Sequence, residues 1–399
     1  MNIVLFDTPE ARKSLIPFSY TRALAKIRIG IGTVEEKWKR YLHGNYSFLT
    51  APYLSDKFPC AEAEKNLCIN STICPEQVLS EAIKKLEVNQ KLVKDDILIA
   101  VRCDRAVLQD LHNPDFDASS LKSVVFEGPL TQIKNNWDIF LLNEKELRKD
   151  FQWISTEGTT QRIQDRSTIV YNEESIFIEK DVSIRAAILN AESGPIYIGS
   201  NVTIQEGAII RGPVAICEGT RISAGARIYN ATTIGPYAKV GGEINNSVIL
   251  GYSNKVHDGF MGNSVIGEWC NLGAGTNTSN LRNDYSNVKI WDNHKGEFDT
   301  IDLKFCGLFM GDHSKCAINT MFHAGTVVGV SSNIFGVDFL DKFIPSFTWG
   351  VPSTRIQTYL LDKALEAAER MTTRRLVQLT EQDKKILSHI FLTTSIYRS

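Results

Sequence analysis

The sequence from residue 198 to residue 240 reads IGSNVT-IQEGAI-IRGPVA-ICEGTR-ISAGAR-IYNATT-IGPYAK-V, and an aliphatic residue opens each group of six. A period of six fits neither the alternation of a half-buried strand nor the 3.6-residue turn of an amphipathic helix. It fits a short strand followed by a tight corner, and three such units close one triangular coil. Coils stack at the strand spacing of about 4.8 Å, so the aliphatic residues form an internal column. The pattern predicts a left-handed parallel β-helix built from hexapeptide repeats.

The repeat extends beyond this stretch and is broken twice. Further units begin at Ile266 and at Met310, so we expect the β-helix to occupy residues 168–345. The frame is lost at about 244–262 and again at 281–303. Insertions in a solenoid project as loops from one face and commonly carry the functional site.

The segments on either side of the repeat have different patterns. Residues 1–152 predict an α/β domain with a largely parallel sheet, because apolar strands alternate with helical stretches. Residues 153–167 are polar and read as a linker, and residues 346–399 predict a helical tail that caps the solenoid. The individual elements expected are strands at Ile3–Phe6, Ile97–Val101 and Ser123–Phe126, helices at Thr33–Tyr41, Glu76–Leu86 and Lys134–Asp150, and tail helices at 353–370 and after the capping box Thr380–Asp383.

The composition excludes several classes of protein. A net charge of -2 over 399 residues, without a Lys/Arg run, gives no reason to expect a nucleic-acid partner. No apolar stretch approaches the roughly 18 residues that span a bilayer, and the first residues do not form a signal peptide. The eight cysteines are scattered without a C-x-x-C pair, which is typical of reduced thiols in a cytoplasmic protein.

The segment from Val256 to Asn280 reads VHDGFMGNSVIGEWCNLGAGTNTSN. It resembles the acetyltransferase half of the bacterial bifunctional UDP-N-acetylglucosamine pyrophosphorylase / glucosamine-1-phosphate N-acetyltransferases. The shared features are a histidine before a Met-Gly step, an Asn-Leu-Gly-Ala-Gly-Thr run and an asparagine six residues after its alanine. The order of domains, α/β first and β-helix second, also matches. The resemblance implies a divergent member that N-acetylates an amino-sugar-1-phosphate with acetyl-CoA and then transfers a nucleotidyl group from UTP.

The resemblance makes His257 the catalytic base. N-acetylation requires a free amine to attack a thioester, and an imidazole with the ordinary histidine pKa of about 6.5 can accept the proton. The alternative is a histidine that only packs or lies on the surface. Asn280 would hold the amino sugar.

The resemblance also implies a binding groove for acetyl-CoA. It would be lined by Gly273, Ala274, Asp312 and Ala324. Backbone N–H groups of the Gly273–Gly275 turn would stabilise the oxyanion. The alternative is that these small residues serve only as corners of the β-helix.

Two departures from the family concern the sugar phosphate. A lysine that the family uses for this phosphate is replaced by Asn245, and a tyrosine after the family's asparagine is replaced by Leu281. We expect Lys255 or Arg227 to bind the phosphate instead, and the acceptor can therefore differ from glucosamine-1-phosphate.

The N-terminal domain lacks the Gly-rich loop of sugar nucleotidyltransferases. Its segment RKSLIPFSYTR, residues 12–22, is similar to the Arg-x-x-Pro-Leu-Thr-x-x-Arg stretch of that class. Basic side chains can neutralise a triphosphate and a sugar phosphate, although a solvated basic loop is the alternative. The candidates are Arg12, Arg22, Lys26 and Arg28.

Asp104 follows the predicted strand Ile97–Val101 and is the candidate Mg²⁺ ligand. The family places an aspartate after the equivalent strand, and Mg²⁺ prefers carboxylate, phosphate and water oxygens. A helix N-cap is the alternative role of Asp104. Asp7, also at a strand end, is a weaker candidate for the metal.

Three other readings of the chain stay open. Only one of the two halves is active, or the chain is a trimeric assembly module without catalysis. The third is a zinc enzyme similar to γ-carbonic anhydrases, which would use His257, His294, His313 or His323 at a subunit interface. The resemblance itself implies a homotrimer with the acetyl-CoA site between neighbours.

Overall fold

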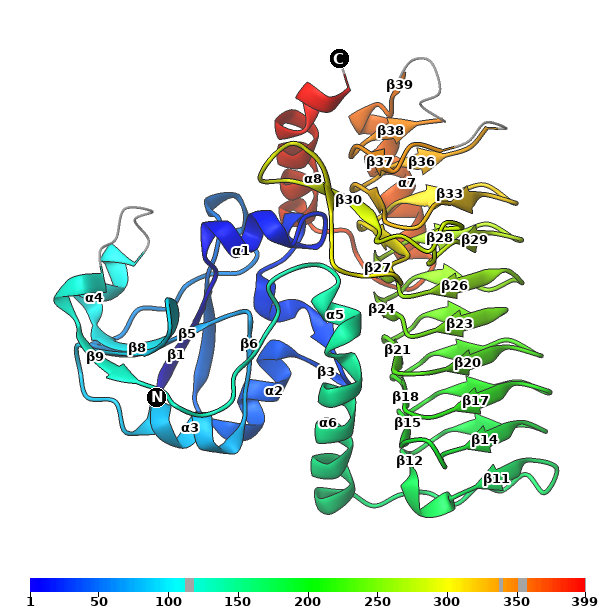
Figure 1. Ribbon diagram of the computed structural model, residues 1–399, viewed down its shortest axis with the longest axis horizontal. Helices are drawn as coiled ribbons and strands as arrows, with labels where there is room; N and C mark the ends of the chain where they lie inside the picture. Colours follow the sequence, from blue (N-terminus) through cyan, green and yellow to red (C-terminus); the bar gives the residue numbers. More distant parts are fainter. Residues whose placement is uncertain (112–117, 337–339, 351–356, 399) are drawn as a thin grey trace. The chain divides into compact units, whose positions relative to one another are not determined.

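The computed structural model describes residues 1–111, 118–336, 340–350 and 357–398. The chain divides into two compact units (Figure 1). The α/β unit comprises Met1–Leu15, Thr21–Ile27 and Gly32–Asn135, and the β-helix unit comprises Ile16–Tyr20, Arg28–Ile31 and Asn136–Ser399.

The α/β unit contains a mixed sheet of six strands in the order β4-β1-β5-β8-β7-β9. The predicted strands and helices of this region are present, with shifted ends. Its strands are β1 (Asn2–Phe6), β4 (Asn45–Leu49), β5 (Lys65–Asn70), β7 (Gln90–Lys94), β8 (Ile97–Asp104) and β9 (Lys122–Val125), with a small pair β6 (Ile73–Cys74) and β10 (Thr131–Gln132). Its helices are α1 (Pro9–Ser14), α2 (Val34–Tyr41), α3 (Gln77–Lys84) and α4 (Arg105–Asp110).

The sheet is largely parallel, as expected, because every strand except β8 runs in the same direction. Strands β4, β1 and β5 are parallel, but β8 runs antiparallel to both of its neighbours, β5 and β7. The carboxyl end of β8 therefore lies beside the amino end of β5, and not beside the carboxyl ends of β1 and β5. Residues 90–104 form the adjacent strands β7 and β8 with a short connection, and such a connection permits antiparallel pairing only.

The β-helix unit is a stack of triangular coils with three parallel faces (Figure 1). Face 1 consists of β11 (Ile169–Tyr171), β14 (Ile188–Asn190), β17 (Ile209–Arg211), β20 (Arg227–Tyr229), β23 (Glu243–Asn245) and β26 (Phe260–Gly262). Face 2 consists of β12 (Ile176–Ile178), β15 (Ile196–Ile198), β18 (Val214–Ile216), β21 (Thr232–Ile234), β24 (Val248–Gly251), β27 (Val265–Glu268), β32 (Leu308–Met310), β35 (Thr326–Val328) and β37 (Phe343–Ile344). Face 3 consists of β13 (Ser183–Ile184), β16 (Thr203–Ile204), β19 (Arg221–Ile222), β22 (Lys239–Val240), β25 (Asn254–Lys255), β28 (Asn271–Leu272), β33 (Lys315–Cys316), β36 (Asn333–Ile334), β38 (Thr348–Trp349) and the antiparallel β39 (Gln357–Thr358).

The six-residue repeat forms the core of this unit, as predicted. The eight residues that open the groups are each 0% exposed: Ile198, Ile204, Ile210, Ile216, Ile222, Ile228, Ile234 and Val240. Burying one such side chain contributes about 1.5–3 kcal/mol relative to leaving it in water. The column thus stabilises every coil against its two neighbours.

The two predicted insertions have different outcomes. Residues 244–262 are not a projecting loop, because they form the regular strands β24, β25 and β26. The frame is lost there because the coils are shorter: Arg221 pairs with Lys239, 18 residues later, whereas Lys239 pairs with Asn254, 15 residues later. Residues 281–303 do leave the stack, as a hairpin of β30 (Lys289–Asp292) and β31 (Glu297–Thr300) that lies between the paired strands β29 (Asn277–Thr278) and β34 (Met321–Phe322) in the chain.

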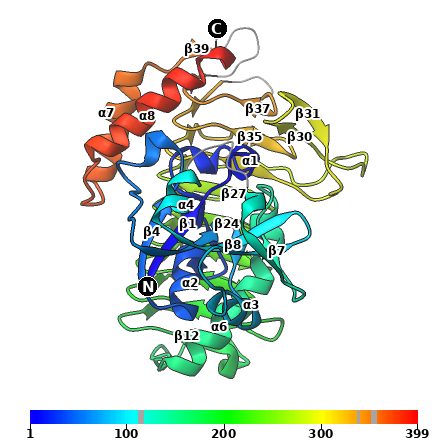
Figure 2. The ribbon, with the colours of Figure 1, turned by 90° about the vertical axis from the view of Figure 1, so that its left-hand side faces the viewer.

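The helices of the β-helix unit are α5 (Asp138–Leu141), α6 (Asn143–Glu157), α7 (Leu361–Thr373) and α8 (Glu381–Thr393). The predicted boundary at residue 152 falls inside α6, and residues 353–356 of the predicted tail helix lie outside the described residues. The predicted capping box at Thr380 and Asp383 is present. In Figure 2 the β30–β31 hairpin lies on one side of the last coils and α7 on the other.

Helix α6 packs on face 2 of the β-helix. Leu147 is buried in a cluster with Phe177 and Tyr197 of face 2. The amide nitrogen of Asn143 donates to the carbonyl oxygen of Ala231 and to the hydroxyl of Thr233. These buried contacts explain why α6 belongs to the same compact unit as the coils.

Candidate active site

His257 lies in an exposed turn between β25 and β26, at the corner between faces 3 and 1. The turn stacks on the next coil, because the N–H of Gly275 donates to the carbonyl oxygen of Asp258 at 3.1 Å. Gly259 has a φ of +122°, and a Cβ at this position would lie 2.0 Å from the carbonyl oxygen of Thr276. Only glycine permits this approach, so the sequence fixes the His257 turn against the Gly273–Thr276 turn.

Lys255 does not point toward a substrate phosphate, and that prediction is wrong. Its side chain occupies the internal column of face 3, between Val240 and Leu272, and is 2% exposed. The ammonium donates to the carbonyl oxygen of His257 at 2.7 Å and to that of Gly241 at 3.3 Å. Burial lowers the pKa of Lys255 from 10.5 to about 8. The lysine therefore anchors the His257 turn from inside the β-helix.

The turn at Gly273–Gly275 leaves only one N–H group for an oxyanion. The N–H of Gly273 donates to the carbonyl oxygen of Cys316 at 3.1 Å, and that of Gly275 is bonded to Asp258. Within the part of the chain that the structure describes, the N–H of Ala274 has no acceptor. The half-buried Ala274, one coil beyond His257, thus remains the candidate donor.

Asn280 lies beside the last strand of face 1. Its amide nitrogen donates to the side-chain oxygen of Asn263 at 2.7 Å. A Cβ on Gly262 would come within 2.7 Å of this amide nitrogen and 2.6 Å of the Phe260 ring. The glycine of the predicted Met-Gly step therefore makes room for the Asn280 side chain.

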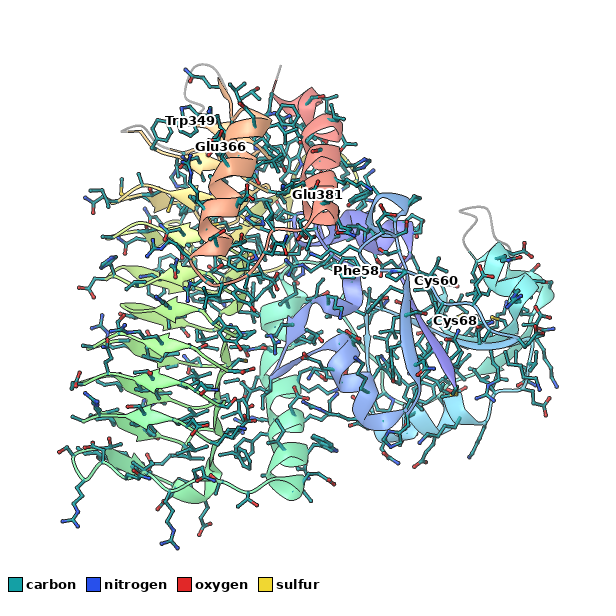
Figure 3. The ribbon with its side chains drawn as sticks, turned by 180° about the vertical axis from the view of Figure 1, so that it is seen from behind. Phe58, Cys60, Cys68, Trp349, Glu366 and Glu381 are labelled. Atoms are coloured by element: carbon teal, nitrogen blue, oxygen red, sulfur yellow. The ribbon has the colours of Figure 1, made fainter. Side chains whose placement is uncertain are left out.

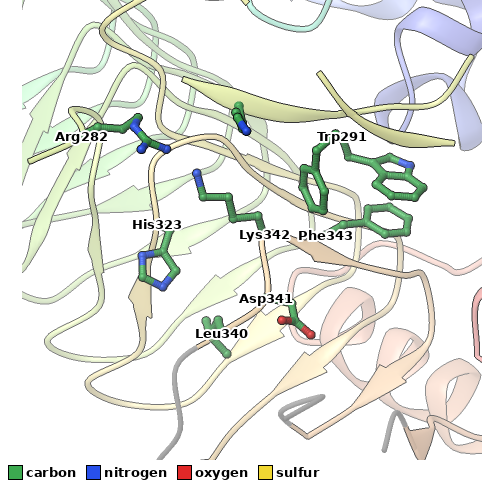
Figure 4. A pocket seen from close by; sticks show the side chains of 9 residues that line it. Arg282, Trp291, His323, Leu340, Asp341, Lys342 and Phe343 are labelled. Carbon is green, nitrogen blue, oxygen red and sulfur yellow. The ribbon is translucent and has the colours of Figure 1, made fainter. Parts of the chain in front are cut away.

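A basic pocket begins two residues after Asn280 (Figure 4). It has a volume of about 650 Å³ and is lined by the inserted hairpin and by the coils beneath it: Arg282, Lys289, Trp291, Phe298, His323, Leu340, Asp341, Lys342 and Phe343. Burial lowers the pKa of Lys342, and the charges of Arg282 and Lys289 lower it further. Arg282 is paired with Asp284 at 2.8 Å, and Asp341 also lines the cavity. Lys289 and Lys342 therefore supply the positive charge that favours an anionic ligand.

The remaining candidate residues of the β-helix unit are Ala324, Asp312 and Arg227. Ala324, 5% exposed, adjoins His323 of the basic pocket. Asp312 is 4% exposed and accepts the N–H of Glu268 at 2.8 Å, so it links two coils. Arg227 lies on β20, two strands before β26 on face 1, and pairs with Glu243 at 3.2 Å.

In the α/β unit, Asp7 and Arg12 form the centre of a network at the carboxyl ends of β1 and β4. Arg12 donates to Asp7 at 2.8 Å, to the hydroxyl of Thr50 at 3.0 Å and to the hydroxyl of Tyr53 at 3.0 Å. It also donates to the carbonyl oxygen of Arg22 at 3.2 Å. Burial raises the pKa of Asp7, and the charge of Arg12 opposes this shift. This edge of parallel strands is where open α/β sheets bind ligands.

The remaining basic residues of that segment are not gathered at this network. Lys26 is paired with Glu35 and lies over the ring of Phe48, 4.9 Å from its centre. Arg28 belongs to the β-helix unit, where it donates to the carbonyl oxygen of Ile31 and contacts the sulfur of Cys217 at 3.8 Å. The sequence gives no sign of this division, because it cannot show that residues 28–31 leave the α/β unit.

Asp104 has the alternative role considered for it, that of a helix N-cap. It is the N-cap of α4 and accepts the N–H of Val107 at 3.0 Å. It pairs with Lys65 at the start of β5, so it lies at the sheet edge opposite to Asp7. The reason for expecting Mg²⁺ at Asp104, a parallel β8, is therefore removed.

The histidines and the possible metal-binding groups bear on the alternative of a zinc enzyme. No group of three or more His, Cys, Asp or Glu side chains among the described residues has the arrangement of a metal site. His313 stacks on Trp269 with ring centres 6.3 Å apart, whereas His294 lies in the exposed hairpin turn. No helix in the described ranges is long and apolar enough to cross a bilayer.

Comparison with known proteins relates the chain to sugar nucleotidyltransferases and to acetyltransferases. The family model of sugar nucleotidyl transferases matches residues 3–159. A bifunctional sugar-1-phosphate nucleotidylyltransferase/acetyltransferase of Sulfurisphaera tokodaii is 27% identical over 265 residues, 66% of this chain and 59% of the relative. The bifunctional protein GlmU of Methanocaldococcus jannaschii is 35% identical over 107 residues, 27% of this chain and 26% of the relative. The chain thus spans less than two thirds of the length of either protein.

Two further similar proteins are named as an acetyltransferase and an acyltransferase. The uncharacterized acetyltransferase YaiX of Escherichia coli O6:K15:H31 is 30% identical over 193 residues, 45% of this chain and 79% of the relative. The solved UDP-N-acetylglucosamine acyltransferase of Francisella novicida is 12% identical with a TM-score of 0.34, covering 58% of this chain and 77% of that chain.

The fold and the matches define a transferase with an α/β nucleotidyltransferase-type unit, a left-handed β-helix of the acyltransferase type and a helical C-terminal tail. The chain belongs to the acetyltransferase family that includes YaiX, and its residues 3–159 match the sugar nucleotidyl transferases.

Proposed function

We propose that the chain is a bifunctional enzyme of sugar-nucleotide biosynthesis. The β-helix unit N-acetylates an amino-sugar-1-phosphate, for which glucosamine-1-phosphate is the first candidate, and the α/β unit transfers a uridylyl group from UTP to the product. The observation that carries the proposal is the stacking of the His257 turn on the Ala274 turn in a member of this family. Both turns are held by bonds between successive coils, so the two groups are preorganised.

In the acetyl transfer, acetyl-CoA supplies the thioester. A bond forms between the sugar amine nitrogen and the carbonyl carbon, while the carbon–sulfur bond breaks and the thiol leaves. His257 accepts the proton that the amine loses, and its exposure allows the proton to pass on to the leaving sulfur or to water. The free N–H of Ala274 donates to the carbonyl oxygen, where negative charge develops.

The basic pocket fits the phosphates of acetyl-CoA. Positive charge comes from Lys289 and Lys342. Ala324 follows His323, which lines the pocket. We further propose a homotrimer, in which neighbouring subunits complete this groove. Sedimentation velocity of the full chain tests the trimer directly.

The nucleotidyl transfer has weaker support. The carboxyl edge of β4, β1 and β5 is the proposed place for UTP, with Mg²⁺ bound to its phosphates. Asp104 does not fit as the metal ligand, because it caps α4 at the other edge. Arg12 and Lys26 already pair with carboxylates, which favours a second candidate, an acetyltransferase whose α/β unit is a scaffold.

Two assays on the full chain separate these functions. The first follows thiol release from acetyl-CoA with glucosamine-1-phosphate, and the second follows pyrophosphate release from UTP with N-acetylglucosamine-1-phosphate and Mg²⁺. His257→Ala should abolish thiol release and leave pyrophosphate release unchanged, and His43→Ala, an exposed histidine of the α/β unit, serves as the control. Thiol release alone would support the scaffold. Full acetyl transfer by His257→Ala would refute the role of His257.

A further inference from the structure

A second basic pocket lies on face 3 of the β-helix, beneath the end of α7. It has a volume of about 480 Å³, and no Asp or Glu side chain lines it. Arg221 and Lys239 come from successive strands of face 3, whereas Arg374 and Arg375 follow α7. Figure 3 shows α7 beside the coils with Glu366 on its exposed side, so the acidic residues of this helix lie outside the pocket.

The four cations have no acidic partner. In the described ranges, none of them forms an ion pair, and Arg375 donates instead to the side-chain oxygen of Asn254 at 2.9 Å. The charge of Arg375 is the largest cause that lowers the pKa of Lys239, and Arg221 and Arg374 add to it. The fold therefore holds four like charges together at an electrostatic cost that no ion pair among the described residues offsets.

We propose that this pocket binds a polyphosphate, either free or as the diphosphate or triphosphate group of a nucleotide. Three arginine guanidinium groups and one ammonium match the three to four negative charges of such a group. The amide nitrogens of Asn254 and Asn271 add donors at the same wall. A sugar monophosphate carries too little charge to neutralise all four cations. This binding does not depend on the proposed transferase activities.

Two double substitutions test the pocket, because its four cations come from two segments of the chain. Arg374→Gln/Arg375→Gln removes the cations that follow α7, and Arg221→Gln/Lys239→Gln removes those of face 3. Arg370→Gln is the matched control, because Arg370 lies on the same helix, is exposed and pairs with Glu366 at 3.2 Å outside the pocket. All three variants remove only exposed or half-buried charges, so the coils should fold normally.

Isothermal titration of the full chain with inorganic tripolyphosphate, without Mg²⁺, provides the measurement. We expect both double variants to bind at least tenfold more weakly than the unchanged protein and Arg370→Gln to bind equally well. Weaker binding at higher salt should accompany this, because the contacts are ionic. UTP that binds more tightly than tripolyphosphate would identify a nucleotide as the ligand.

Several outcomes would overturn the proposal. Equal binding by the double variants would do so, as would binding that Arg12→Gln abolishes, since Arg12 belongs to the α/β unit. Tighter binding of glucosamine-1-phosphate than of tripolyphosphate, lost in the double variants, would assign the pocket to a monophosphate instead. Undiminished binding by a double variant whose circular dichroism spectrum is unchanged is the clearest refutation.

Discussion

The replacement Lys255→Met tests whether a charge is buried in the β-helix to hold the His257 turn. Methionine has nearly the same length as lysine and suits a column whose other members are aliphatic. It removes the charge and the two hydrogen bonds to the carbonyl oxygens of Gly241 and His257. Stability and acetyl transfer should therefore change in opposite directions at neutral pH.

The magnitude follows from the pKa of Lys255. A fall from 10.5 to about 8 means that folding disfavours the charged form by about 3 kcal/mol, since each pKa unit corresponds to about 1.4 kcal/mol. The lost hydrogen bonds offset about 1–2 kcal/mol of the gain. At pH 7 the variant should thus be more stable by about 1–2 kcal/mol.

The sign reverses as the pH rises. Below pH 8 the folded protein carries the full cost of the charge, whereas between pH 8 and 10.5 the folded lysine is neutral and the unfolded one is still charged. The stability of the unchanged protein should therefore rise over this interval relative to that of the variant. Above it the variant should be the less stable of the two, because only the lost hydrogen bonds remain.

Urea unfolding of both proteins from pH 7 to pH 10, followed by circular dichroism, measures this difference. Other titrating groups are common to the two proteins and cancel. Lys180→Met is the control, because Lys180 is exposed in the same unit and should change stability by less than about 0.5 kcal/mol at every pH. A difference between Lys255→Met and the unchanged protein that does not vary with pH would refute the reasoning, as would undiminished acetyl transfer by the variant.

Three further predictions concern the core, the sugar site and the α/β unit. Ile210→Ala should cost about 2–5 kcal/mol in urea unfolding because it empties part of the column, whereas Ile209→Ala, at a position 41% exposed in the same strand, should cost less than about 1 kcal/mol. Gly262→Ala should reduce thiol release at least tenfold with little loss of stability, because the new methyl group displaces only the side-chain ends of Phe260 and Asn280; unchanged kinetics would argue against a role for that amide. Arg12→Gln should destabilise the α/β unit by about 3 kcal/mol at pH 7, because its carboxylate partner stays buried, and the loss should shrink as the pH falls and that carboxyl becomes protonated.

The repeat made the fold predictable from the sequence, because one column of side chains serves every coil. Each aliphatic residue at the first position has the same environment as its neighbours one coil away, so the periodicity alone identifies the core. The insertion that contains the hairpin at 289–300 was predictable as a segment without the repeat, but the same criterion wrongly made residues 244–262 an insertion. The capping box of Thr380 was predictable because it depends only on residues within one turn.

Features that depend on contacts far apart in the sequence were not predictable. Nothing near Asn143 shows that its amide will bond to residues 88 and 90 positions later on face 2. The direction of β8 depends on its partners in the sheet, and an error there moved Asp104 to the wrong edge. Sequence similarity identified His257 but could not show that Lys255, two residues earlier, points inward.

Several irregular features of the β-helix occur at its candidate site. The coil before Lys255 has 15 residues and the one after it has 17, whereas the two coils that precede them on face 3 have 18 each. The same coil places a charged residue in an otherwise apolar or thiol-containing column, and its turn requires Gly259 at a positive φ. Each of these features reduces stability relative to a regular repeat, and stability alone would not retain them. Their coincidence at His257 is what a functional constraint on this coil predicts, and the same reasoning directs mutagenesis to residues 254–262 before any other part of the solenoid.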